Sequence, residues 1–334
     1  MKANLLIMLI ILFASSCGKE QYSKPVSISY ESSFSTEPRP IAIAVKQNPG
    51  YVYIANCNPG INNYSSKIQK FNLNGELLKT AVDFTTFIQG KYSRYNPIDI
   101  CIDNTGNLYA LVKPSQLNEE PWTNYKGFCV LQFDINDNLK KEYDFSEFEH
   151  HWIPSAIAYS NNKLYVTNGL IIKKISLTND QVTDISIQTS IENVDSLIFL
   201  PVSDMIIKSE GIIYLTGQAV QAVFNDDVSG CHVTRLEPQT NQLNTFYSKG
   251  RTGIMAAMLN NPGLTISDIG NLYLATFYGK SLEVYDRGDE FILQVDIRTA
   301  VGDDTRPIDL ALSNNHIYIA DHQNNNVHIF KEHY

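Results

Sequence analysis

Three aspartates stand at equivalent positions of a repeated sequence phrase. Each precedes a tyrosine of that phrase by nine or ten residues: Asp99, Asp204 and Asp309. Carboxylates that converge from separate strands could hold Ca²⁺ or another hard divalent cation. In the alternative interpretation, each aspartate accepts hydrogen bonds from nearby backbone N–H groups, or pairs with a neighbouring arginine such as Arg306, and fixes the chain locally. The residue types alone leave both interpretations open.

The phrase that carries these aspartates repeats six times along the chain. Each copy has an alternating apolar run, a polar turn and then a tyrosine: Tyr53, Tyr109, Tyr165, Tyr214, Tyr273 and Tyr318. Successive tyrosines lie 45 to 59 residues apart, a length that fits four strands per repeat. We therefore predict an all-β fold, a six-bladed β-propeller with one blade per repeat.

Each repeat can be divided into two hairpins. The segment Ile100–Tyr109 has a β-rich run, an Asp-Asn-Thr-Gly turn and a second strand that starts at Leu108. A further hairpin follows in most repeats, as at Phe71–Leu77 with its Asn-Gly turn. Two such hairpins make one four-stranded blade.

The last repeat lacks a fourth strand. Asn326–Lys331 would be its third strand, and the chain stops at Tyr334. Near the other terminus, Pro25–Tyr30 alternates and belongs to no repeat. We predict that this N-terminal strand closes the last blade and removes an exposed sheet edge.

Within this ring the three aspartates would lie at the mouth of the innermost strands of blades two, four and six. Aligning the repeats on their tyrosines gives other residues at the equivalent positions of blades one, three and five: Ala42, Ala156 and Leu264. The carboxylates would therefore surround the channel with pseudo-threefold spacing.

The chain resembles the NHL-type six-bladed β-propellers. The likeness is strongest in Pro307–Leu312, Ile317–His322 and Asn325–Phe330, and a similar pattern occurs in Pro40–Val45 with Val52–Asn56. It spans roughly residues 26 to 334. The resemblance implies a fold more than a function, because such propellers include protein-binding platforms, sensor domains and metal-dependent lyases or hydrolases.

The N-terminus is typical of an export signal. A basic Lys2 precedes an apolar stretch, Leu5–Ala14, that is too short to span a bilayer. The following Ala14-Ser15-Ser16-Cys17 resembles a bacterial lipobox, with Ala14 where Leu is most frequent. We predict a lipoprotein of the bacterial cell envelope, anchored through Cys17 and periplasmic or surface-exposed. Its parts would be a signal peptide (1–16), a lipidated Cys with a short tether (17–25) and the propeller (26–334).

The charge balance excludes one class of partner. The chain has 26 Lys and Arg against 35 Asp and Glu, a net charge of −9. Nucleic-acid binding depends on neutralising phosphates with basic residues, so no nucleic-acid partner is expected. Besides Cys17 there are four cysteines without metal-finger spacing, and the sequence selects no disulfide pairing among them: Cys57, Cys101, Cys129 and Cys231.

Loop lengths indicate a recognition face. Links within the first, second and fourth repeats are long, over about residues 56–66, 112–127 and 217–230. In a propeller these links open on the same face as the blade-to-blade connections, so we expect that face to bind a partner. Its arginines and tryptophans are the side chains that contribute most to binding. The candidate ligand-binding residues are Arg39, Arg94, Trp122, Trp152, Arg251 and Arg306.

Two functions are compatible with these residues. The first is a module that binds a protein, peptide or glycan through the long-loop face, without catalysis. The alternative is a metal-dependent lyase or hydrolase at the channel mouth, where His150 or His151 would join the three aspartates as ligand or acid/base. No HExxH, P-loop, GxSxG or GxGxxG motif supports another enzyme class.

Overall fold

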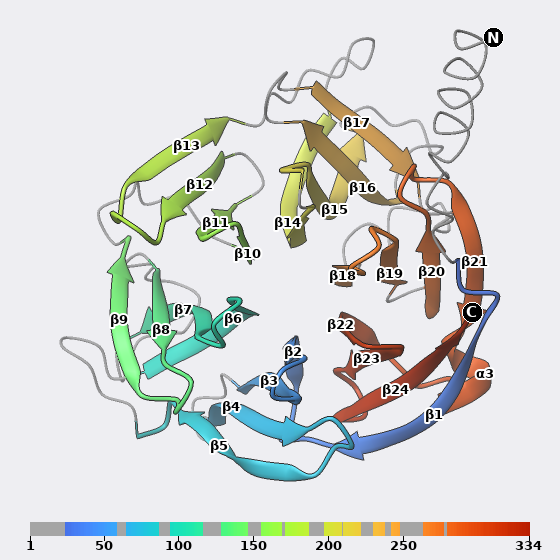
Figure 1. The fold of residues 1–334 in the computed structure, drawn as a ribbon, viewed down its shortest axis with the longest axis horizontal. Coiled ribbons are helices and arrows are strands. Elements are labelled where there is room, and N and C mark those ends of the chain that lie inside the picture. The colour runs from blue at the N-terminus through green and yellow to red at the C-terminus, as the bar shows by residue number, and fades with distance from the viewer. Residues whose placement is uncertain are drawn as a thin grey trace, which may run out of the picture.

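The computed structural model describes most of the chain from Lys24 to the C-terminus, and it is almost entirely β-structure. The described residues are 24–58, 65–86, 94–115, 128–145, 155–168, 171–186, 197–208, 210–221, 230–237, 242–247, 263–276 and 279–334. They form six four-stranded sheets arranged around a central axis (Figure 1). The predicted six-bladed β-propeller is confirmed. Within the described residues, no helix has the length and apolar character to cross a membrane.

Every blade is an antiparallel sheet in which neighbouring strands follow each other along the chain, except at the closure. The first strand of each blade is innermost (Figure 1). In blade order, the strands are β2 (Pro40–Lys46), β3 (Tyr51–Asn58), β4 (Ser65–Asn72) and β5 (Leu77–Asp83); β6 (Arg94–Ile102), β7 (Leu108–Ser115), β8 (Cys129–Phe133) and β9 (Leu139–Asp144); β10 (Ala156–Ser160), β11 (Lys163–Thr167), β12 (Ile171–Ser176) and β13 (Val182–Ser186); β14 (Leu197–Ile207), β15 (Ile213–Gln221), β16 (Gly230–Glu237) and β17 (Gln242–Tyr247); β18 (Gly263–Ile266), β19 (Leu272–Thr276), β20 (Ser281–Tyr285) and β21 (Phe291–Asp296); β22 (Pro307–Ser313), β23 (His316–Asp321), β24 (Asn326–His333) and β1 (Ser27–Ser35).

The N-terminal strand closes the ring. β1 pairs antiparallel with β24 at the outer edge of the last blade, as predicted. The strand covers Ser27–Ser35, so it begins two residues later and ends five residues later than the expected Pro25–Tyr30. Near its end, the Phe34 ring lies 4.8 Å from the Phe71 ring of the first blade, measured between centroids. β1 therefore joins the last blade to the first through side chains as well as through the chain itself.

The two ends of the ring differ in the length of their connections. At one end, here called the turn face, the strands are joined by turns of two to five residues, such as 103–107, 161–162 and 286–290. The opposite end, the long-loop face, has every connection of six or more residues: 59–64, 84–93, 116–128, 145–155, 187–196, 222–229, 248–262 and 297–306. The last of these contains a short helix, α3 (Ile297–Val301). Links within the blades are shorter than the sequence suggested because the strands on either side extend further.

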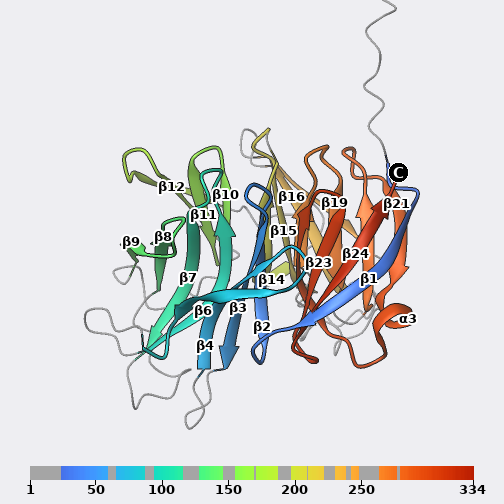
Figure 2. The same ribbon diagram turned by 60° about the horizontal axis from the view of Figure 1, so that its bottom comes forward.

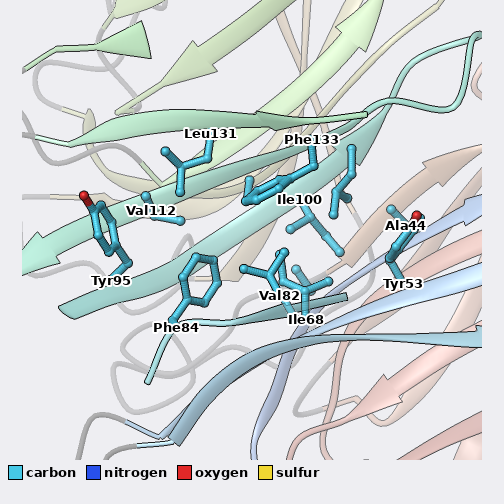
Figure 3. Packing of buried hydrophobic residues seen from close by; sticks show 14 of the residues in the cluster. Ala44, Tyr53, Ile68, Val82, Phe84, Tyr95, Ile100, Val112, Leu131 and Phe133 are labelled. Atoms are coloured by element: carbon cyan, nitrogen blue, oxygen red, sulfur yellow. The ribbon is translucent and has the colours of Figure 1, made fainter. Parts of the chain in front are cut away.

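The repeated tyrosine is a contact between blades. Figure 3 shows the interface of the first two blades, where Tyr53 lies among apolar side chains from both sheets. Its hydroxyl donates to Asp137 in the β8–β9 turn of the next blade, at 2.5 Å. Tyr214 likewise donates to Asp289 of the following blade at 2.7 Å. All six tyrosines of the phrase are buried, and those of blades one, four, five and six also donate a hydrogen bond to the following blade.

Replacing Tyr53 by Phe should lower the free energy of unfolding by about 1.5–3 kcal/mol, because a hydrogen bond to a charged partner is lost inside the interface. Urea unfolding followed by tryptophan fluorescence measures this change. Tyr165→Phe is the matched control, since its ring is also buried but no hydrogen bond to its hydroxyl occurs within the described residues. Equal losses in the two variants would contradict the role of the Tyr53 hydroxyl.

Candidate functional site: the central channel

A narrow cavity of about 190 Å³ runs along the axis of the ring. All six innermost strands line it: β2, β6, β10, β14, β18 and β22. Asp99, Asp204 and Asp309 line it together, so the structure brings the three predicted carboxylates to one site. Asp99 and Asp309 are each 8% exposed, and Asp204 is half-buried.

Each carboxylate joins two blades through backbone amides. One oxygen of Asp99 accepts a hydrogen bond from the N–H of Ile100 on the same strand, at 2.7 Å. Its other oxygen accepts from the N–H of Ile157 on β10, the innermost strand of the next blade, also at 2.7 Å. Asp99 therefore links blade two to blade three at the channel wall.

The same arrangement recurs at the other two aspartates. Asp204 accepts from its neighbour Met205 and from Leu264 of blade five, both at 2.6 Å. Asp309 accepts from its neighbour Leu310 and from Ile43 of blade one, both at 2.7 Å. The aspartates of the even-numbered blades thus each hold the following odd-numbered blade, which is the local fixing role considered as the alternative to a metal site.

One equivalence drawn from the sequence is wrong. The strand register pairs Ala42 with Ala55, and it pairs Gly263, not Leu264, with Ala275 at the matching position of blade five. Gly263 packs so closely that a Cβ on it would lie 2.4 Å from the Cα of Asp309. Gly263 lies ten residues before its tyrosine, as Asp99 and Asp204 do, whereas Leu264 has the nine-residue spacing of Asp309. The choice between the two depends on the strand register, which the sequence does not show.

Burial controls the electrostatics of the channel. It raises the pKa of Asp99 to about 7, against the opposing effect of its two N–H donors. Burial also raises the pKa of Asp204 and of Asp309 well above the usual range. The negative charges of Asp309 and Asp99 raise the pKa of Asp204 further, and that of Asp99 raises the pKa of Asp309. Three buried carboxylates that face each other cannot all ionise easily. These side chains therefore take up protons at a higher pH than solvent-exposed aspartates do.

These shifts predict a pH-dependent stability. A carboxyl whose pKa is higher in the folded than in the unfolded chain favours the folded state when protonated, so the free energy of unfolding should rise as the pH falls from about 7 towards 4. Asp99→Asn removes one such group and should reduce this slope by up to about 1.4 kcal/mol per pH unit. Urea unfolding at several pH values between 5 and 7 measures both slopes.

Asp99→Asn should also be less stable at every pH, because its amide group presents a donor to one of the two N–H groups. Asp303→Asn is the control, since Asp303 is exposed and lies outside the channel. The explanation is wrong if Asp99→Asn keeps the full slope of the parent chain.

The geometry does not itself assemble a metal centre in the described part of the chain. No group of three or more His, Cys, Asp and Glu side chains there is placed to hold a metal ion. The hydrogen bonds to backbone amides account for the three aspartates without a cation. The Ca²⁺ site stays a prediction, and the two histidines proposed to complete it, His150 and His151, lie outside the described residues.

Two of the predicted ligand-binding arginines lie on connections of the long-loop face. Arg39 and Arg306 are both exposed there. His322 links the two connections, because its N–H donates to the carbonyl oxygen of Arg306 and its Nδ1 lies 3.0 Å from the carbonyl oxygen of Pro40, the residue after Arg39. Arg94 begins β6, but its side chain is not among those described. The remaining predicted residues lie outside the described part: Cys17, Trp122, Trp152 and Arg251.

A second cavity opens on the turn face, and sequence reasoning missed it. Its volume is about 520 Å³, and it is lined by turn residues of blades two to five together with Lys208 and Arg287. Tyr159 lines both this cavity and the narrow channel, so the two adjoin. Each lining segment looks like an ordinary hairpin turn in sequence. Only the ring brings them together around a hollow.

Comparison with known families gives one match, at the end of the chain. Residues 305–330 match the model of the NHL repeat. The last blade carries an NHL repeat. This is the segment in which the resemblance noted from the sequence was strongest. The match includes Asp309, so one carboxylate of the channel belongs to the NHL repeat of this blade.

Solved structures with the same fold extend over nearly the whole chain. Virginiamycin B lyase from Staphylococcus aureus is 12% identical, with a TM-score of 0.55 over 91% of this chain and 99% of the lyase. A protein of unknown function from Bacteroides thetaiotaomicron is 14% identical, with a TM-score of 0.59 over 92% of this chain and 76% of that protein. Raptor from Chaetomium thermophilum is 11% identical, with a TM-score of 0.54 over 92% of this chain and 29% of Raptor.

At these identities the likeness establishes the propeller fold alone. A search of curated protein sequences found no match. The similar structures include an enzyme and a protein without known function, so the function of this chain has to be argued from its own structure.

Proposed function

We propose that this protein is a bacterial lipoprotein whose NHL-type propeller binds a protein, peptide or glycan through its long-loop face. The observation that carries the proposal is the distribution of the connections: all those of six or more residues leave the strands at one end of the ring. Long connections on a rigid scaffold are the usual place for recognition. The blades supply that scaffold, and the loops supply the contact surface.

The residue types on that face support binding. Arg39 and Arg306 are both exposed there, Arg39 on the connection before the first blade and Arg306 on the connection before strands β22–β24 of the last blade. Trp122, Trp152 and Arg251 lie outside the described residues, in sequence segments that join strand ends of the same face. Trp and Arg dominate the energy of protein interfaces, because each buries a large surface and keeps a polar group for hydrogen bonding.

Binding can be tested with the biotinylated ring, residues 18–334, against a glycan array and against isolated envelope proteins. For any ligand found, Trp122→Ala and Trp152→Ala should weaken binding by about tenfold or more, the loss expected of central aromatic residues. Phe291→Ala is the control, because Phe291 is an exposed aromatic residue at the turn face. A ligand that loses affinity only in the control would place recognition at the other end of the ring.

The lipid anchor has its own test. Full-length protein expressed in a bacterium should fractionate with membranes, and mass spectrometry of its N-terminal peptide should show an acylated Cys17. Cys17→Ser should leave the same ring in the soluble fraction. Acyl chains supply about 0.8 kcal/mol per buried CH₂, so two or three chains hold a protein stably. An unmodified Cys17 in a membrane-bound protein would contradict the proposal.

A second candidate function is a metal-dependent lyase or hydrolase at the channel. The observation in its favour is the convergence of three carboxylates in a channel of the same fold as virginiamycin B lyase. Elemental analysis of residues 18–334 beside Asp99→Asn discriminates the two functions. A stoichiometric divalent metal that the variant lacks would favour the enzyme. No metal in either protein would remove this candidate.

A further inference from the structure

The point at which the chain enters the ring is defined by its first strand. β1 runs antiparallel to β24, with Ser27 opposite His333 and Ser35 opposite Asn326. β24 ends at the turn face, since it follows β23, which begins directly after the 314–315 turn. β1 therefore begins at the turn face, close to the C-terminus (Figure 2). Any segment that precedes Lys24 enters the ring from that end.

Two contacts hold the entry point at the turn face. The N–H of Val26 donates to the carbonyl oxygen of His333 at 2.8 Å, which continues the β1–β24 ladder. The ammonium group of Lys24 lies 2.7 Å from a carboxylate oxygen of Asp286 in the β20–β21 turn. Because Lys24 is exposed, this ion pair is a weak restraint. It nevertheless places Lys24, near the end of the tether, against a turn of the neighbouring blade.

The length of the tether limits which face can approach a membrane. Six residues, 18–23, separate Cys17 from Lys24, so a fully extended tether reaches about 25 Å. The flank of the last blade has the length of β24, eight residues, or about 26 Å at 3.3 Å per residue. A lipidated Cys17 would therefore use the entire tether to pass along the blade before it reached the long-loop face. No length would remain for inserting the lipid.

The exposed apolar side chains independently mark the same end of the ring. Among the described residues, eight large hydrophobic side chains are exposed, and all except Tyr30 lie at the turn face. Each of the seven is in a turn, at the start of a strand that follows a turn, or next to the C-terminal chain end: Val26, Leu77, Leu78, Ile135, Val182, Phe291 and Tyr334. They come from blades one, two, three, five and six, and together they are called the apolar rim below. Aromatic and aliphatic side chains at a surface facing lipid can enter the boundary between headgroups and acyl chains.

We propose that the turn face of the propeller lies against the lipid bilayer, with the apolar rim at the membrane boundary and the long-loop face directed away from it. This orientation rests on the proposed anchor at Cys17. The net charge of −9 gives no general attraction to anionic lipid, so the short tether and the rim, rather than a basic patch, hold the face down. The 520 Å³ cavity then opens towards the membrane, and the binding loops are free to meet a partner.

A dye at either end of one strand tests the orientation. Asn315→Cys and Gln323→Cys place an exposed thiol on the two sides of β23, at the turn face and the long-loop face respectively. The native Cys57 thiol is a poor competitor, because burial raises its pKa to about 11, and the unsubstituted chain reports the remaining background. The lipidated full-length protein is reconstituted into phosphatidylcholine vesicles containing a lipid with a nitroxide on its headgroup.

The dye at residue 315 should be quenched several-fold more strongly than the dye at residue 323. Replacing Leu77, Leu78 and Ile135 together by Ser should reduce that difference while the fold remains intact, because all three side chains are exposed. Equal quenching at both sites, or stronger quenching at residue 323, in protein that floats with the vesicles would overturn the orientation alone. Protein that does not float would refute the anchor, and the orientation with it.

Discussion

A chain that lacks residues 18–35 should fail to close its ring and should lose more than about 5 kcal/mol of stability, a loss well beyond that of an ordinary substitution. The deletion removes β1, and with it the ladder to β24 and the ring contact between Tyr30 and Phe330, whose centroids are 5.6 Å apart. It also removes Phe34 from Phe71 of the first blade. The remaining three-stranded blade would expose the edge of β24, which favours pairing with another chain.

Thermal unfolding followed by circular dichroism and size-exclusion chromatography measure both consequences. The matched control is deletion of residues 18–23, which shortens the tether but leaves β1 and should preserve the stability of the full chain. Phe34→Ala isolates the contact with the first blade and should cost about 1–3 kcal/mol, less than a fully buried phenylalanine. If the 18–35 deletion melts at the temperature of the control, closure by β1 contributes little to the ring.

Asp321→Ala should be among the most destabilising single substitutions in this chain, at about 3–5 kcal/mol, because it removes a fully buried carboxylate from several hydrogen-bond donors, among them the buried ring of His328. Asp321 is fully buried at the end of β23. Its carboxylate accepts hydrogen bonds from the N–H groups of Arg306, Gln323 and Asn324. It also accepts from the Asn324 side chain at 2.8 Å and lies 3.0 Å from Nε2 of His328.

These bonds also set the pH at which Asp321 acts. Burial by itself would raise its pKa, but the hydrogen bonds from His328, Arg306 and Asn324 outweigh burial and hold the pKa well below the usual range. A depressed pKa means that the stabilisation is fully present above about pH 4 and is lost only as the pH falls towards the folded value. Urea unfolding at pH 7 therefore measures the full loss in Asp321→Ala.

Asp304→Ala is the appropriate control, since Asp304 lies on the connection that carries Arg306 but is itself exposed. Surface substitutions of this kind usually change stability by less than about 0.5 kcal/mol. A loss below about 1 kcal/mol in Asp321→Ala would mean that the freed N–H groups find other partners.

The sequence by itself determined the number of blades and the closure of the ring. Both follow from local signals. A strand is indicated by alternating apolar and polar residues, and a turn by residues that can adopt the backbone conformation the turn requires. The 103–107 turn is an example, because Gly106 adopts a φ of +92° and one Asp103 oxygen accepts from the N–H groups of Thr105 and Asn107. Such preferences act over a few residues and need no knowledge of the rest of the fold.

The tertiary structure decided the role of the three channel aspartates. From sequence, each could bind a cation or accept hydrogen bonds from the backbone: Asp99, Asp204 and Asp309. Only the structure shows that they accept from backbone N–H groups of the next blades, those of Ile157, Leu264 and Ile43. The close approach of Gly263 to Asp309 was hidden for the same reason. These contacts join residues between 46 and 266 positions apart, so no pattern of neighbouring residues could report them.

The two faces of the ring were also predicted only in part. The sequence predicted that long connections gather on one face, because loop lengths can be read locally and the order of the strands then determines the face on which each loop lies. The turn-face cavity, the apolar rim and the end at which the tether enters all depend on how six sheets are placed around one axis. Side chains from separate blades become neighbours only when packing between the sheets closes the ring, and that packing joins segments that sequence order keeps far apart.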